Sequence, residues 1–79
     1  MEISYDSKYN IGYIRLRDKV MNVKTISISD ELNIDIDSDG KVYGIELLNA
    51  GEQLGVLQGK PFTFINETEN KKTEIQVLY

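Results

Sequence analysis

The chain of 79 residues contains no cysteine, no histidine and no tryptophan, and it has a single proline, Pro61. Without cysteine, disulfide bonds and thiolate metal sites are excluded. Without histidine, the usual zinc ligand and the commonest general base are missing. A chain of this length is close to the lower limit for a self-sufficient core. Neither a disulfide bond nor a zinc ion bound by cysteine or histidine can stabilise it further. We therefore expect it to bury further apolar surface as a homodimer.

The chain also lacks a long apolar run and an excess of positive charge. No stretch approaches the 18 or so apolar residues of a membrane span, and the first ten residues have neither the basic nor the apolar region of a signal peptide. The net charge of −4 disfavours binding to nucleic-acid phosphates and could attract a basic protein. We expect a single cytoplasmic domain over residues 1–79, with no membrane association.

One segment, residues 35–46, matches every ligand position of the calcium-loop pattern D-x-[DN]-x-[DN]-G-x5-E. The ligands would be Asp35, Asp37, Asp39 and Glu46. Such a loop lies between two helices and gathers six to eight oxygens around one ion. Here residues 32–37 alternate between apolar and polar, and residues 42–48 are rich in β-branched, aromatic and leucine residues, so both flanks favour strands. We interpret the segment as a β-hairpin and keep calcium binding as an alternative.

The dipeptide Asp39-Gly40 between these two apolar segments predicts a two-residue type I′ turn. The resulting register pairs Ile36 with Tyr43, Ile34 with Ile45 and Leu32 with Leu47, with all six side chains on one face. Three of the acids then share the outer face as solvated carboxylates, namely Asp35, Asp37 and Glu46. Same-face neighbours on a strand are about 7 Å apart, which is too far for a closed cage of oxygens.

Alternating patterns also predict strands over residues 2–5, 12–17 and 23–29, with residues 18–22 as a connection. Together with the hairpin they give an antiparallel meander of about five short strands. Asn49 as N-cap, Glu52 at the third helical position and Gly59 at the end predict one short helix near residues 50–58. Residues 62–65 and 73–79 would add a C-terminal hairpin. The predicted fold class is mainly β, on the borderline with α+β.

Several short motifs occur in the order and spacing of a known family. They are Tyr5-Asp6, the segment Tyr-Ile-Arg-Leu at 13–16, the acidic segment 35–40 that ends in Asp-Gly, and Gly-Ile-Glu at 44–46. Over about residues 3–50 the chain resembles the small prokaryotic proteins known as domain of unknown function 2283. The resemblance implies a compact β-rich domain and no particular activity. Because such proteins often look like companions of small toxin-like proteins, it also suggests an antitoxin role.

No set of residues predicts catalysis. The acids Asp35, Asp37 and Glu46 share an open face on which they stay hydrated and similar, whereas paired catalytic carboxylates need environments that separate their pKa values. No histidine is present to activate a serine. We therefore assign no catalytic, cofactor-binding or metal-binding residue, and we expect no cofactor.

Two features could bind a macromolecule. Tyr13, Arg15 and Arg17 share one face of a predicted strand and could stack on bases, although the acidic net charge favours an ordinary exposed strand face. Edge strands and the polar segment after Gly59 could pair with another protein chain. The preferred interpretation of that segment is that its apolar residues complete the domain's own core; these are Phe62, Phe64 and Ile65.

The sequence thus favours a non-enzymatic protein-interaction module that associates with itself as a homodimer or with a protein partner, and the family resemblance suggests an antitoxin-like role for it. The alternative is a domain that binds a divalent cation, calcium, through Asp35, Asp37, Asp39 and Glu46. The acidic net charge disfavours nucleic acid as a partner of either.

Overall fold

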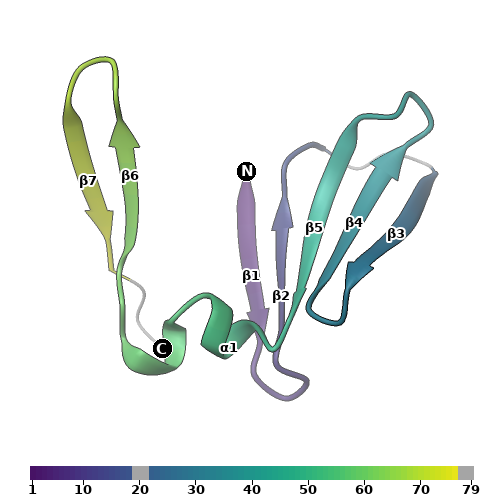
Figure 1. Cartoon of the computed structure of the whole chain (residues 1–79), viewed down its shortest axis with the longest axis horizontal. Coiled ribbons are helices and arrows are strands. Elements are labelled where there is room, and N and C mark those ends of the chain that lie inside the picture. The colour runs from purple at the N-terminus through teal and green to yellow at the C-terminus, as the bar shows by residue number, and fades with distance from the viewer. Residues whose placement is uncertain (19–21, 77–79) are drawn as a thin grey trace.

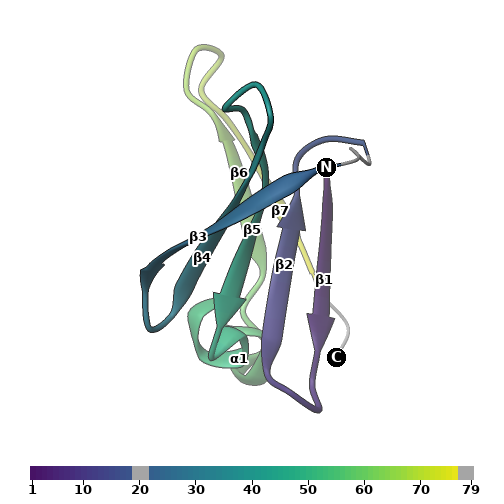
Figure 2. The ribbon, with the colours of Figure 1, turned by 90° about the vertical axis from the view of Figure 1, so that its right-hand side faces the viewer.

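Five of the seven strands form one antiparallel sheet, as the computed structural model shows for residues 1–18 and 22–76 (Figure 1). These strands are β1 (Glu2–Asp6), β2 (Ile11–Arg15), β3 (Val23–Ser29), β4 (Leu32–Asp37) and β5 (Val42–Leu48). The mainly β fold class is confirmed. The sheet is strongly twisted, so that β3 and β4 are inclined to β1 and β2 in the side view (Figure 2).

The strand order β1-β2-β5-β4-β3 differs from that of a simple meander. Only β3, β4 and β5 follow one another, while β2 pairs with β5, so that β2 to β5 have the Greek-key order. This order places β5, which is rich in valine, isoleucine and leucine, at the centre of the sheet. A central strand has neighbours on both edges, and it is therefore the position in which apolar side chains lose most contact with water.

The β4–β5 hairpin has a different turn from the predicted one. The Asp37 N–H donates to the Lys41 carbonyl (2.9 Å) and the Gly40 N–H to the Asp37 carbonyl (3.0 Å), which closes a three-residue loop over residues 38–40. Within it Gly40 has a positive φ of 80° and Asp39 does not. The predicted type I′ turn is therefore wrong; the loop is a type I turn followed by a left-handed glycine.

The cause is the side chain of Asp37, whose Oδ1 accepts hydrogen bonds from the N–H groups of Asp39 (2.9 Å) and Lys41 (3.0 Å). The longer loop shifts the register, so Ile36 pairs with Val42 and not with Tyr43.

Beyond this bulge the predicted register is confirmed. Ile34 lies opposite Ile45, and Leu32 lies opposite Leu47. Strands flank the acidic segment on both sides, where a calcium loop would have helices.

The predicted helix is divided into α1 (Ala50–Gln53) and the 3₁₀ helix η1 (Val56–Gln58), because Gly55 between them has a positive φ of 71°. Gly59 ends η1 as predicted, with φ 67°. Asn49 occupies the N-cap position, but its backbone is left-handed and its side chain makes no capping bond. The cap comes from another element: Asn10 Oδ1 accepts the N–H of Gly51 at 2.7 Å.

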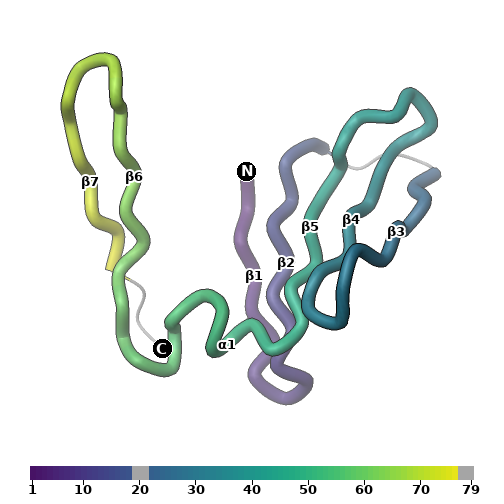
Figure 3. Tube along the Cα trace, viewed as in Figure 1, coloured from purple at the N-terminus to yellow at the C-terminus, as the bar shows by residue number. Residues whose placement is uncertain are grey.

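The remaining strands, β6 (Phe62–Asn66) and β7 (Lys71–Ile75), form a two-stranded sheet of their own, which we call the arm. The predicted C-terminal hairpin is thereby confirmed, although its second strand begins earlier than residue 73. Parts of two predicted segments, 19–21 and 77–79, lie outside the described residues. The chain trace shows the arm rising from η1 and standing apart from the five-stranded sheet (Figure 3).

Very little of the described chain is buried. Its buried apolar residues are Ala50 and Val56, with 0% and 5% of their surface exposed. The radius of gyration is 14.1 Å, against about 12 Å for a compact domain of this length. The longest helix among the described residues, α1, has four residues, and none could cross a membrane.

Candidate interaction surface

A single row of isoleucines crosses one face of the five-stranded sheet. The register places one residue of the row on each strand, in the order Ile3, Ile14, Ile45, Ile34 and Ile26. Neighbouring strands are about 4.8 Å apart, so this isoleucine row is about 19 Å wide from the first strand to the last. It forms a continuous apolar band across the sheet.

No member of the isoleucine row is buried. Ile3 is 41% exposed and Ile26 is 37% exposed, and the three central members are only half-buried. The helical segment covers one end of this face, where Ala50 and Leu54 pack against Gly12; a Cβ added there would lie 3.0 Å from the Ala50 Cβ. An apolar sheet face is normally covered by a second layer, and this layer is incomplete.

The arm exposes a second apolar surface. Its register pairs Phe62 with Ile75 and Phe64 with Thr73, so these four side chains share one face. Phe64 is 65% exposed and Ile75 is 55% exposed. The interpretation that residues 62–65 complete the domain's own core is therefore wrong for Phe64 and for Ile65, which is 59% exposed on the opposite face. The reason is that the chain leaves η1 away from the sheet, so the arm has no layer beneath it.

The other face of the five-stranded sheet is polar and internally hydrogen bonded. Asp35 accepts from the Tyr13 hydroxyl and from the Thr25 hydroxyl, each at 2.6 Å, and the Asn33 amide donates to Glu46 at 2.8 Å. Burial, together with the hydrogen bond to the negatively charged Asp35, raises the pKa of Tyr13 well above its ordinary value of 10.0. The register places Asp35, Asp37 and Glu46 on this face as predicted, but all three are half-buried and hydrogen bonded and are not the solvated carboxylates expected.

These bonds bear on the calcium alternative. Asp35 and Glu46 are occupied by side chains of neighbouring strands, and Asp37 closes its own loop. Within residues 1–18 and 22–76, no group of three or more acidic side chains comes together as a metal site would require. The four residues of the pattern, which include Asp39, are spread along a hairpin, and the geometry gives the calcium alternative no support.

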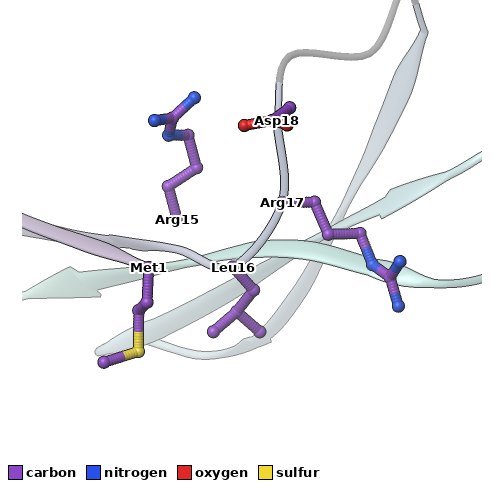
Figure 4. Close-up of a pocket in the computed structure, with 5 residues that line it drawn as sticks. All are labelled: Met1, Arg15, Leu16, Arg17 and Asp18. Carbon is purple, nitrogen blue, oxygen red and sulfur yellow. The ribbon is translucent and has the colours of Figure 1, made fainter.

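The predicted aromatic and basic stripe is divided. β2 ends at Arg15, and Arg17 lies beyond it, with its Nε donating to the Val42 carbonyl at 3.2 Å. Arg15 forms an ion pair with Glu2 at 3.0 Å, and the charge of Glu2 raises the pKa of Arg15. Around a hollow of about 330 Å³ the two guanidinium groups point in different directions (Figure 4). They do not converge on a single anion.

The sequence matches the family described as a protein of unknown function, DUF2283, over residues 2–50. The chain belongs to this family. The match ends at the first residue of α1, so the DUF2283 region is the five-stranded sheet, and the arm lies outside it. Comparison with curated proteins and with solved structures gives no match.

The isoleucine row itself was only partly visible in the sequence. Alternation places Ile3, Ile14 and Ile26 each on one face of its own strand, and the hairpin pattern joins Ile34 to Ile45. What joins all five is the pairing of β2 with β5, between residues about thirty positions apart in the chain. Pairing at this separation leaves no local signal in the sequence.

Proposed function

We propose that this DUF2283 protein is a non-enzymatic protein-interaction module whose contact surface is the isoleucine row. The observation that carries the proposal is that the row crosses all five strands in register and none of its members is buried. Fully burying one isoleucine side chain is worth about 1.5–3 kcal/mol. Covering the part of the row that is still exposed therefore favours association.

The polar face supports the non-enzymatic part of the proposal. Its carboxylates are engaged by Tyr13, Thr25 and Asn33, and the chain has no histidine or cysteine to act as base or nucleophile. An antitoxin-like role would be one form of such a module. The net charge of −4 would favour a basic protein as the partner in that case.

The experiment compares two charge substitutions at adjacent positions of β4. Ile34→Lys places a charge in the middle of the isoleucine row, while Asn33→Lys adds the same charge to the polar face, next to Glu46. Each full-length variant is expressed with a tag in the native cell. The molar mass of the purified protein and the identity of anything bound to it are then measured, and circular dichroism checks that both variants are folded.

The expected result is that the unmodified chain and Asn33→Lys form a complex, with themselves or with a partner, and that Ile34→Lys is a folded monomer. The proposal fails if all three proteins are recovered alone as monomers.

A further inference from the structure

We propose that two copies of this chain form a dimer by exchanging arms, so that the β6–β7 arm of each copy packs over the isoleucine row of the other. This inference rests on the proposed function, because it assigns an occupant to the same row.

The arm lacks the contacts that an isolated hairpin needs. It has two strands of five residues, and a two-stranded hairpin alone in water is marginally stable at best. It nevertheless has one apolar face, formed by Phe62, Phe64 and Ile75. A hairpin with one apolar face becomes stable when that face packs on another layer.

The isoleucine row is a layer of matching size. A strand of five residues is about 17 Å long, and the row is about 19 Å wide, so an arm lying across the strands would cover most of it. The two surfaces match in character: the row consists of isoleucine, and the arm face has Thr73 beside its apolar residues, away from the loop. Lys72 and Glu74 lie on the other face of the arm, and Lys71 lies opposite Asn66 at the loop end of the apolar face.

The chain exposes more surface than a compact monomer of its mass, as one subunit taken from an obligate dimer would. The accessible surface is 6200 Å², whereas a compact protein of 9.0 kDa exposes about 4,900 Å². The excess is about 1,300 Å² per chain, or about 2,600 Å² for two chains, which falls within the range of obligate homodimers.

The connection holds the arm away from its own sheet. The Lys60 N–H donates to the Gly55 carbonyl at 3.1 Å, and the Gln76 amide donates to the Gly59 carbonyl at 3.1 Å. Pro61 further restricts the backbone between η1 and β6. These contacts hold the base of the arm against η1. A two-fold pair of open chains can fill both isoleucine rows at once, which is the geometry of a domain-swapped dimer.

The absence of cysteine allows a direct test in the full chain. One chain carries Phe64→Cys and a second, with a larger tag, carries Ile45→Cys; the two are mixed, refolded together and treated with a short bismaleimide. Thr63→Cys replaces Phe64→Cys as the matched control. Because Thr63 projects from the opposite side of the pleat, we expect at least about tenfold more cross-linked heterodimer from Phe64→Cys than from Thr63→Cys.

Sedimentation equilibrium of two further variants does not depend on cross-linking. Phe64→Glu should weaken dimerisation by at least about a hundredfold, because each dimer contains the substitution twice at a buried contact, and Thr63→Glu should change it by less than about threefold.

Three results would overturn arm exchange, and they differ in what they leave standing. A dimer that resists Phe64→Glu but is lost with Ile34→Lys means that the sheets pack directly, and the proposed function survives. A monomer that binds a different protein through the row also leaves the proposed function intact. A monomer in which Phe64→Cys and Ile45→Cys, placed in one chain, link within that chain means that the arm closes over its own row, and both proposals fail.

Discussion

Two hairpins of this chain have nearly the same local design and very different surroundings. In β1–β2 and in β6–β7, two strands of five residues are joined by a four-residue loop whose last residue is a left-handed asparagine, Asn10 or Asn70, with φ 55°. In each, the residue before the loop braces it: Asp6 Oδ1 accepts the Lys8 N–H at 2.9 Å, and Asn66 Oδ1 accepts the Glu69 N–H at 3.2 Å.

The difference lies in what each hairpin contacts. β2 pairs with β5, and Gly12 receives the side chains of α1, whereas β6 and β7 pair only with each other among the described residues. Local sequence is therefore sufficient to form a hairpin, and neighbours decide whether it is stable. The arm has the hairpin and lacks the neighbour, and this is the reason for assigning it a partner.

The largest difference in stability between the two hairpins is expected on substitution of their left-handed asparagines. Asn10 Oδ1 accepts from the Gly51 N–H and the Tyr5 hydroxyl, and its amide donates to Asn49. No hydrogen bond of the Asn70 side chain occurs within the described residues. We expect Asn10→Ala to lower the free energy of unfolding by about 3 kcal/mol and Asn70→Ala by about 1 kcal/mol. Urea denaturation followed by circular dichroism measures both.

Glycine at the same positions separates backbone strain from side-chain bonding. Glycine accepts the left-handed conformation without strain, so Asn70→Gly should be close to neutral. Asn10→Gly should still cost about 2 kcal/mol, because the Gly51 N–H loses its acceptor. Equal losses for Asn10→Gly and Asn70→Gly would contradict this account of the two hairpins.

A smaller effect is expected at the second residue of each returning strand. A side chain at Gly12 would meet Ala50 and Leu54 and push α1 off the sheet, so Gly12→Val should cost about 2 kcal/mol. Lys72 has the equivalent place in β7 and is exposed. Lys72→Val should therefore change stability by less than about 0.5 kcal/mol in thermal denaturation. If Gly12→Val were equally harmless, α1 would not be packed on this sheet.

The smallest loss of stability is expected at Tyr13, a residue that has no equivalent in the arm. Removing its hydroxyl with Tyr13→Phe should cost about 1 kcal/mol at neutral pH, because the bond to Asp35 is lost. Since folding raises the pKa of Tyr13 above its ordinary 10.0, the folded state holds this proton more tightly than the unfolded state. Stability from this group is complete below pH 10 and is lost as the pH rises further.

Tyr13→Phe is the control for this pH dependence, because it lacks the hydroxyl that titrates. The unmodified chain should lose stability between neutral pH and pH above 10 more steeply than Tyr13→Phe does, as measured by urea denaturation at each pH. Parallel pH profiles for the two proteins would show that the Tyr13–Asp35 bond does not contribute to folding.

Local patterns in the sequence were enough to predict the strands, the acids on the outer face and the C-terminal hairpin. They failed where a turn or a helix end depends on a side chain that bonds to the backbone or on the conformation of a glycine. The Asp37 carboxylate reorganised the β4–β5 turn, and Gly55 divided the helix whose cap comes from Asn10, about forty residues away. Apolar character alone predicted burial for Phe64 and Ile65, because sequence does not show which surface faces them.

The same limit applies to the candidate site. Each isoleucine was recognisable as one face of a strand, but the row depends on the pairing of β2 with β5. How much of the row is exposed depends on which segments cover it in the folded chain, and the sequence does not show this.

The central claim is that another copy of the chain covers the isoleucine row. It is tested most directly by solvent paramagnetic relaxation of isoleucine methyl groups in the unmodified, full-length protein, with Ile65 on the outer face of the arm as the exposed reference. Ile34 and Ile45 are already less exposed than Ile65 in a single chain, so the decisive comparison is between the unmodified protein and Phe64→Glu. We predict that Phe64→Glu strengthens the relaxation of the Ile34 and Ile45 methyl groups and leaves that of Ile65 unchanged. Equal relaxation of Ile34 and Ile45 in the two proteins at high concentration would contradict the account.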